Sequence, residues 1–133
     1  MLLAADPSEV TRLNAWLDKT FDEAGVEESV RSCVKLCLNE AVTNVILYGM
    51  ADRPDPVIEV DVEADPHMVI SRISDNGTPF NPLEWPEKPA YTNLEEAVPG
   101  GFGIHLLRES ASGLAYERDG EWNRLAITCG KSG

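Results

Sequence analysis

The spacing of apolar residues predicts two helices in the first third of the chain. A helix that ends at Gly25 is predicted by residues that recur at helical spacing, namely Leu13, Trp16, Leu17, Thr20 and Phe21. The segment Asp6-Pro7-Ser8-Glu9 precedes it and supplies a capping carboxylate and a proline at the first helical turn. A longer helix is predicted from Glu27 to about Tyr48. Its apolar stripe consists of Val30, Val34, Cys37, Ala41, Val45 and Tyr48.

After residue 56 the hydrophobic period changes from helical to two, which is typical of strands with one solvated face. Asp65-Pro66-His67 separates the first two such segments, so they are predicted to form an antiparallel hairpin. Asp119-Gly120 is a typical hairpin turn between the last two. A helix is predicted at 102–108, between the hairpins. The predicted strands are residues 57–63, 68–74, 113–118 and 122–128, with a stub of strand at residues 2–4.

This order of elements predicts an α+β fold, a two-layer sandwich of a mostly antiparallel sheet with helices on one face. Regular βα alternation, which a doubly wound parallel sheet requires, does not occur. The length of 133 residues suits one domain spanning 1–133. Residues 76–101 are rich in proline and glycine and have no sustained period, so they are predicted to form a lid or binding loop.

Composition narrows the functional classes. The chain carries 23 acidic against 11 basic residues, for a net charge of −12, which argues against binding to a nucleic-acid backbone or an anionic membrane. Neither a leader nor an apolar run long enough to span a bilayer is apparent. The three cysteines are an odd count with no disulfide-framework spacing, so they are predicted to be reduced. Cys33 and Cys37 are spaced i, i+4 and could be two metal ligands, but packing in the core is the favoured interpretation. We therefore expect a cytoplasmic protein.

Three constellations could carry chemistry, and the first lies on the long helix. Glu40 and Asn44 are spaced i, i+4, along one edge of the apolar stripe. A carboxylate beside a carboxamide suits a general base next to an oxygen ligand for Mg²⁺. A polar pair that only flanks the core is the competing interpretation.

The other two constellations border the predicted lid. Asp75 ends a strand and is followed by Asn76-Gly77-Thr78-Pro79-Phe80, so its carboxylate could accept a hydrogen bond from a purine amino group, although the same residues also favour a plain turn. Gly100-Gly101-Phe102-Gly103-Ile104 opens a helix, whose bare N–H groups suit an anion. A flexible hinge explains these glycines equally well.

Taken together, the order and spacing of the three motifs resemble those of the GHKL, or Bergerat-fold, superfamily, which includes the ATP-binding domains of gyrase, histidine kinases and MutL. The short length is similar to that of the anti-sigma factor serine/threonine kinases, the RsbW and SpoIIAB group. Leu38–Asn44, Asp75–Pro82 and Gly100–Leu107 carry the resemblance, which extends from about Asp6 to Thr128.

The resemblance implies a role for each matching residue. Glu40 would be the catalytic carboxylate, and Asn44 would ligate Mg²⁺ that bridges the phosphates of ATP. Asp75 would bind the adenine amino group, and Gly77 would leave room for the ring. Gly101 and Gly103 would contact phosphates as the lid closes. The implied nucleotide-binding set is Asn44, Asp75, Gly77, Pro79, Phe80, Gly101, Gly103 and Ile104.

The resemblance also implies an activity and its partners. The chain would be a protein kinase that transfers the γ-phosphate of ATP to a serine or threonine of a STAS-fold anti-sigma factor antagonist, with a sigma factor as a second partner. The alternatives are a non-catalytic, nucleotide-gated module that sequesters a regulator, and an ATP-binding domain serving another two-component or phosphatase system.

The chain departs from the family pattern in three places. Met1–Ala4 replaces a full first strand, which weakens the expectation of a homodimer. Ala126 stands where relatives often carry threonine, so we expect a hydroxyl near the base to be missing. Lys88 is the sole basic residue of the predicted lid, which leaves backbone, metal or a residue such as Arg108 to meet the γ-phosphate.

Overall fold

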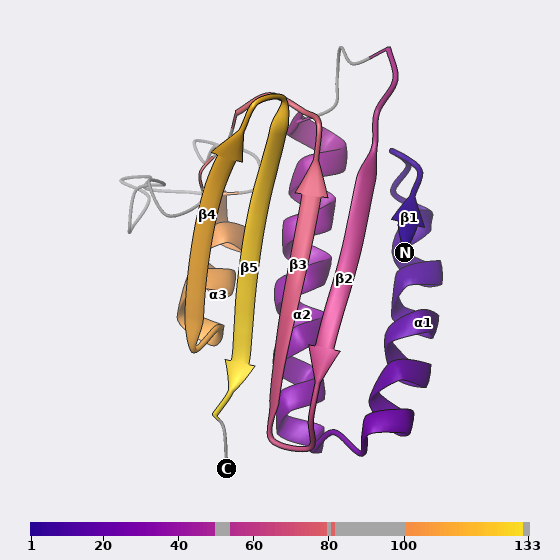
Figure 1. Ribbon diagram of the computed structural model, residues 1–133, viewed down its shortest axis with the longest axis vertical. Helices are drawn as coiled ribbons and strands as arrows, with labels where there is room; N and C mark the ends of the chain where they lie inside the picture. The colour runs from indigo at the N-terminus through magenta and orange to yellow at the C-terminus, as the bar shows by residue number, and fades with distance from the viewer. Residues whose placement is uncertain (50–53, 80, 82–100, 132–133) are drawn as a thin grey trace.

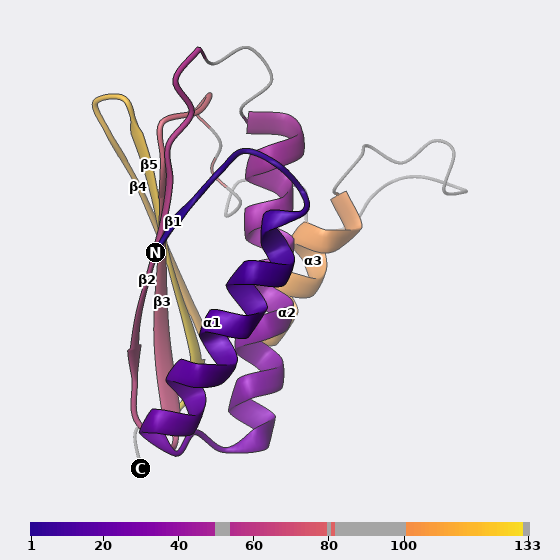
Figure 2. The same cartoon turned by 90° about the vertical axis from the view of Figure 1, so that its right-hand side faces the viewer.

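A computed structural model describes residues 1–49, 54–79, 81 and 101–131. In this part of the chain the strands form one twisted sheet, and the helices cover one of its faces (Figures 1 and 2). The predicted two-layer α+β sandwich is therefore confirmed. The elements are β1 (Leu2–Leu3), α1 (Glu9–Ala24), α2 (Glu28–Asn44), β2 (Ile58–Ala64), β3 (Met68–Asp75), α3 (Gly101–Ser110), β4 (Gly113–Asp119) and β5 (Trp122–Gly130).

All strand pairs of the described sheet are antiparallel, in the order β1-β2-β3-β5-β4. Both predicted hairpins are present, but the second turn lies one residue later than expected. Asp119 still pairs with Trp122, so Gly120 and Glu121 form the loop. Gly120 has φ 60°, a conformation that glycine adopts without steric cost. The β3–β5 pairing places Asp75 directly opposite Asn123, which matters for the site described below.

The long helix ends earlier than the sequence predicts. Regular α2 stops at Asn44, and residues Val45–Gly49 form a wider π-helical turn, η1. The carbonyl of Gly49 accepts a hydrogen bond from the N–H of Thr78 at 3.1 Å. This tertiary contact ties the end of the helix to the segment after β3, and a pattern of apolar residues along the helix alone could not reveal it.

The core lies between the sheet and the helices. Burial of the apolar side chains of this core is the main contribution to the stability of the fold. None of the described helices has the length and apolar character required to cross a bilayer. The largest side chains with essentially no exposure are Phe21, Leu13, Leu17, Leu38, Ile58, Leu107 and Ile127.

The cysteines correct one prediction. Cys33 of α2 and Cys129 of β5 form a disulfide across 96 residues, with their Cα atoms 6.0 Å apart. The expectation that all three cysteines are reduced is therefore wrong for this pair. Cys37 remains a buried free thiol, as predicted. Helical periodicity places Cys37 on the apolar stripe of α2, but it does not reveal that Cys33 faces Cys129 of β5.

We expect replacement of Gly130 by alanine to destabilise the fold strongly. Gly130 has φ 86°, and a Cβ there would lie 2.1 Å from the carbonyl oxygen of His67. The matched control is Gly120→Ala, because Gly120 also has positive φ but open space around it. Urea denaturation should give a loss of about 1 kcal/mol for Gly120→Ala and at least about 3 kcal/mol for Gly130→Ala. Equal losses would contradict the predicted clash.

Candidate functional site

The predicted site motifs belong to neighbouring elements of the fold. The C-terminal end of α2 and the end of β3 lie at the same end of the molecule (Figures 1 and 2). A direct contact joins them, because a Cβ on Gly77 would lie only 2.5 Å from the carbonyl oxygen of Gly49. Any larger residue at position 77 would therefore push the segment after β3 away from the helix. The sequence predicted Gly77 as room for a ring, and the structure adds this backbone contact as a second requirement for glycine.

Asp75 is a buried carboxylate held in a fixed orientation. Its side chain is only 5% exposed. The N–H of Gly77 donates to Oδ1 at 2.9 Å, and Nδ2 of Asn123 donates to the same oxygen at 3.0 Å. Both of these hydrogen bonds end on Oδ1, which leaves Oδ2 as the atom that can accept a hydrogen bond from a ligand. This arrangement is what the predicted contact with a purine amino group requires.

Burial also changes the acidity of Asp75. Desolvation raises the pKa of the carboxyl above its ordinary value, because burial disfavours the charged form. The hydrogen bonds from Asn123 and Gly77 and the positive charge of Arg118 oppose this shift. A perturbed carboxyl with one oxygen left over is typical of a functional site rather than of a structural turn.

Asn123 is a site residue that the sequence did not reveal. Its Nδ2 also donates to the carbonyl of Thr78 at 2.9 Å, and its Oδ1 accepts a hydrogen bond from the hydroxyl of Tyr116. Asn123 is 5% exposed, so these bonds satisfy a buried amide. The chain of contacts from Tyr116 through Asn123 holds Asp75 in place. Only the register of β5 against β3 could have identified it.

Ala126 is not near the predicted position of the adenine base, which corrects an expectation from the sequence. It pairs with Arg72 of β3 and Ala115 of β4 and lines a shallow hollow on the helix-free face of the sheet. An odd offset of three residues from Asn123 turns the side chain to the opposite face of the strand. The position opposite Asp75 therefore already has a hydrogen-bonding side chain, and Ala126 removes nothing from the site.

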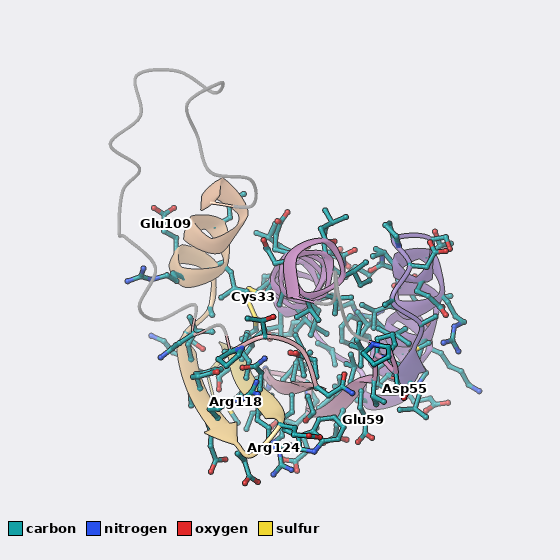
Figure 3. The ribbon with its side chains drawn as sticks, turned by 90° about the horizontal axis from the view of Figure 1, so that it is seen from above. Cys33, Asp55, Glu59, Glu109, Arg118 and Arg124 are labelled. Carbon is teal, nitrogen blue, oxygen red and sulfur yellow. A yellow bond between two sulfur atoms is a disulfide. The ribbon has the colours of Figure 1, made fainter. Side chains whose placement is uncertain are left out.

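Arg118 brings a positive charge to this end of the sheet (Figure 3). Its Nη1 donates to the carbonyl of Gly77 at 2.9 Å, and its Nε donates to the carbonyl of Gly120 at 3.0 Å. Arg118 thus secures both the segment after β3 and the turn between β4 and β5. Nothing in the local sequence pattern distinguishes this arginine from an exposed strand residue.

On α2, Asn44 is buried and oriented while Glu40 is partly exposed. Asn44 is 8% exposed, and its Nδ2 donates to the backbone carbonyl of Glu40 at 2.7 Å. The carboxamide oxygen therefore points away from that carbonyl and is the atom suited to a metal ion. Asn39, which directly precedes Glu40, has a different role: it exchanges hydrogen bonds with Asn14 at 3.0 and 2.9 Å and so joins α2 to α1.

The third motif opens α3. Gly101 is the first residue of the helix, and Gly103 and Ile104 belong to its first turn. The first N–H groups of a helix have no partner within it, so this backbone suits an anion. Arg108 lies in the last turn of α3, about 10 Å along the helix axis from Gly101.

Part of the predicted site falls outside the described residues. Pro79 is exposed just after the hydrogen-bonded Thr78. Phe80, Lys88 and most of the predicted lid at 76–101 lie outside the part of the chain that the structure describes.

The donor set that the described residues offer fits a nucleotide with a hard divalent cation. Mg²⁺ takes oxygen ligands, and its protein sites commonly use one or two side chains together with substrate phosphates and water. Asn44 offers one such oxygen. Asp75 offers the acceptor for an amino group, and the first turn of α3 offers donors for phosphate.

Comparison with known proteins decides the family. Residues 3–129 match the model of the histidine kinase-like ATPase domain. The chain belongs to this family. Membership agrees with the fold and with all three motifs, and it implies ATP as the bound nucleotide.

Curated relatives of this ATPase domain come from several bacteria. The chain is 29% identical over 113 residues to the serine/threonine-protein kinase BtrW of Bordetella bronchiseptica, covering 85% of this chain and 80% of the relative. It is 33% identical over 107 residues to an anti-sigma F factor of Clostridium botulinum, covering 80% and 70%. An anti-sigma F factor of Bacillus subtilis is 26% identical over 107 residues, covering 80% and 68%.

Among solved structures, the histidine kinase domain of a blue-light activated kinase from Erythrobacter litoralis superposes with a TM-score of 0.57 at 14% identity. The match covers 93% of this chain and 60% of that one. At this identity the likeness supports the fold alone.

Proposed function

We propose that this ATPase-family chain is a regulatory protein kinase of the anti-sigma type. It binds ATP with Mg²⁺ and transfers the γ-phosphate to a serine or threonine of a STAS-fold anti-sigma factor antagonist. The observation that carries the proposal is the buried carboxylate of Asp75, which Gly77 and Asn123 hold by Oδ1 while Oδ2 takes part in neither of these hydrogen bonds. The names of the curated relatives support the kinase and anti-sigma assignment.

In this proposal the base of ATP binds at the end of β3. Oδ2 of Asp75 accepts a hydrogen bond from the adenine amino group. Asn123 and Arg118 act as positioning residues, because they hold Asp75 and the segment after it through the hydrogen bonds described above. The close approach of Gly77 to Gly49 keeps this segment against the helical turn that follows α2. This contact would hold the adenine-binding residues at a fixed distance from the residues on α2.

Phosphoryl transfer then requires positioning and neutralisation of charge. The Glu40 carboxylate accepts the proton of the attacking hydroxyl, the hydroxyl oxygen bonds to the γ-phosphorus, and the bond to the bridging oxygen breaks to release ADP. Asn44 would hold Mg²⁺ through its carboxamide oxygen, and a bound Mg²⁺ would supply positive charge against the phosphates. The first-turn N–H groups of α3, at Gly101 and Gly103, bind phosphate oxygens.

The proposed protein partners are the STAS-fold antagonist, a sigma factor and a second copy of this chain. Leu2 of the edge strand β1 is 61% exposed, and β1 pairs with β2 over only two residues. The exposed apolar side chain of Leu2 supports dimerisation at this edge, whereas the shortness of β1 leaves few backbone groups for pairing with a second copy. Light scattering of the purified chain distinguishes a dimer from a monomer.

The non-catalytic module is the competing function, and one argument for it is now removed. The sequence suggested a missing hydroxyl near the base at Ala126, but Ala126 lies on the helix-free face and Asn123 supplies the hydrogen bond. Glu40 is present, as catalysis requires.

The test is incubation of the chain with γ-labelled ATP, Mg²⁺ and a STAS-fold partner encoded beside it. Label on a serine or threonine of the partner supports the kinase. ATP binding without transfer to any neighbouring partner supports the nucleotide-gated module and contradicts the kinase.

Nucleotide affinity should fall on acidification, because two hydrogen bonds already end on Oδ1 of Asp75 and a proton would add to Oδ2. Oδ2 would then be a donor where the adenine amino group needs an acceptor. The raised pKa of Asp75 means that this loss begins above the pH at which an ordinary aspartate titrates. The effect on stability has the opposite sign: burial penalises the charged form in the folded state, so the contribution of Asp75 to stability increases as pH falls through its folded pKa. Calorimetric ATP titrations across this pH range should show the loss in the wild type. The matched control, Asp75→Asn, should lack this component of the pH profile.

A further inference from the structure

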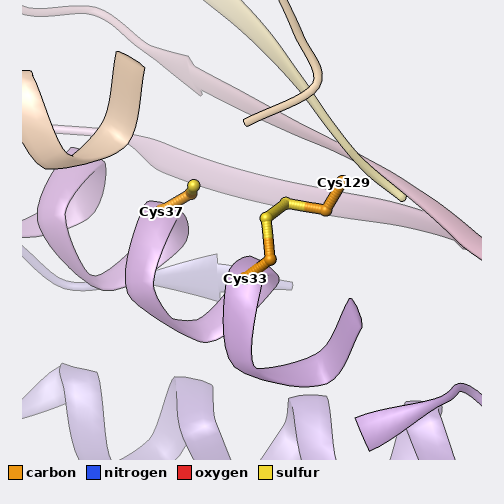
Figure 4. Close-up of side chains that lie close together, drawn as sticks. All are labelled: Cys33, Cys37 and Cys129. Carbon is orange, nitrogen blue, oxygen red and sulfur yellow. A yellow bond between two sulfur atoms is a disulfide. The ribbon is translucent and has the colours of Figure 1, made fainter. Parts of the chain in front are cut away.

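The three cysteines of the chain gather at one place outside the proposed nucleotide site. Cys33 and Cys37 lie one turn apart on α2, and Cys129 lies near the end of β5 (Figure 4). Their three sulfur atoms are all within 4.8 Å of one another. Two of them, on Cys33 and Cys129, form the disulfide, and the third is the free thiol of Cys37. The cluster therefore contains a disulfide cross-link and, next to it, a free thiol.

The cluster joins the elements that carry the nucleotide site. The Cys33 sulfur lies 3.2 Å from the carbonyl oxygen of Ser110, the last residue of α3, and the Cys37 sulfur lies 3.9 Å from that of Leu107. The helix α2 carries Glu40 and Asn44, β5 carries Asn123, and α3 begins with the glycine motif. A bond between α2 and β5 that also touches α3 therefore constrains all of them together.

Access to the three sulfurs is unequal. Cys37 and Cys129 are completely buried, whereas Cys33 is partly exposed. A small thiol from solvent can thus reach the disulfide only at Cys33. Burial raises the pKa of the Cys37 thiol to about 11, so Cys37 stays protonated at neutral pH and does not attack the neighbouring disulfide readily.

We propose that Cys33 and Cys129 form a reversible redox site that exchanges with low-molecular-weight thiols and disulfides, and that its state sets the affinity of the nucleotide site. In reduction, a small thiolate attacks the Cys33 sulfur, the bond to Cys129 breaks, and Cys129 takes the electron pair and a proton. A second small thiolate attacks the mixed disulfide and leaves Cys33 as a thiol. Two electrons and two protons enter the protein, and the small disulfide is the oxidised product; a small disulfide reverses the reaction.

Reduction of the disulfide should weaken the attachment of α2 to β5. The cross-link closes a loop of nearly a hundred residues, which restricts the unfolded chain, so we expect the melting temperature to fall by about 10 °C on reduction. The oxidised form holds α2 against β5, and this preorganisation should favour nucleotide. We expect at least about fivefold weaker ATP binding after reduction, a consequence that rests on the proposed function. By reciprocity, bound ATP should make the disulfide harder to reduce by the same factor.

The test equilibrates the full chain in glutathione buffers of varied ratio, alkylates it under denaturing conditions and counts free thiols by intact mass and peptide mapping. The wild type should change from one to three free thiols in a single two-electron transition, with the oxidised peptide joining Cys33 to Cys129. Cys37→Ala should keep the transition, whereas Cys33→Ser and Cys129→Ser should each abolish it. Three free thiols in every buffer would overturn the proposal, as would stoichiometric zinc or copper bound by the reduced thiols in elemental analysis.

ATP titration of both redox forms tests the coupling. Weaker binding by the reduced form supports it, and equal affinities overturn it even if the disulfide forms. If neither form binds ATP, the proposed function and the coupling fail together, while the thiol counts still decide whether the redox site exists.

Discussion

Replacement of Glu40 by glutamine should reduce γ-phosphate transfer to the partner by a factor of about 100 to 10,000 while leaving ATP affinity within about twofold. Glutamine has nearly the same shape but cannot accept the proton of the attacking hydroxyl. Its backbone carbonyl still accepts the hydrogen bond from Asn44, so the proposed metal ligand keeps its orientation. Initial rates of label transfer and calorimetric ATP titrations measure the two effects separately.

The matched control is Glu23→Gln, an exposed glutamate of α1. It makes the same chemical change at the surface and should leave both transfer and binding unchanged. A Glu40→Gln variant that still transfers phosphate at the wild-type rate would exclude Glu40 as the base. Loss of ATP binding that fully accounts for the loss of transfer would assign Glu40 to nucleotide binding.

Replacement of Asp75 by asparagine should weaken ATP binding roughly 10- to 100-fold, because a hydrogen bond to a charged group contributes about 1.5–3 kcal/mol. Asparagine can still accept from Gly77 and Asn123 through its oxygen. Its amide group would then face the adenine amino group, donor against donor. The fold should lose no stability at neutral pH, since the substitution removes a buried charge that burial disfavours. Calorimetry and urea denaturation provide the two measurements.

Two further variants separate the site from the rest of the strand β5. Asn123→Ala removes the hydrogen bond to Asp75 and should also weaken ATP binding. Ala126→Thr introduces the hydroxyl that the family pattern suggests, but on the helix-free face, and should have no effect on binding. A large effect of Ala126→Thr, or none of Asp75→Asn, would contradict the site as described.

Much of the fold follows from periodicity. The alternation in β2 and β3 predicts a hairpin because the buried set of each strand faces the same layer, and the observed strand Ile58–Ala64 is one residue from its predicted bounds. Helix α1 ends at Gly25, where φ is 64°, for the reason predicted. The π-helical turn at Val45–Gly49 was missed because it accompanies a contact between Gly49 and Thr78, which are far apart in sequence.

Prediction of the site had the same limit. Asp75, Asn44 and Glu40 could be proposed from the sequence because each belongs to a local motif at an element border. Asn123 could not, because its importance comes from lying opposite Asp75, and the register between β3 and β5 depends on tertiary packing. Ala126 was misplaced for the same reason.

The Cys33–Cys129 disulfide likewise joins two side chains from a helix and a strand that are far apart in the sequence. Side chains whose role depends on cross-strand pairing or on packing between the helices and the sheet can therefore be identified only from the structure.

The most direct test of the account compares ATP·Mg²⁺ with GTP·Mg²⁺ in calorimetric titrations of the wild-type chain. Oδ2 of Asp75 should accept a hydrogen bond from the amino group of adenine, whereas guanine presents a carbonyl oxygen at the equivalent position and would leave a buried carboxylate facing another acceptor. The account predicts ATP affinity at least roughly 100-fold above that for GTP. Equal affinities, or failure to bind ATP, would contradict it.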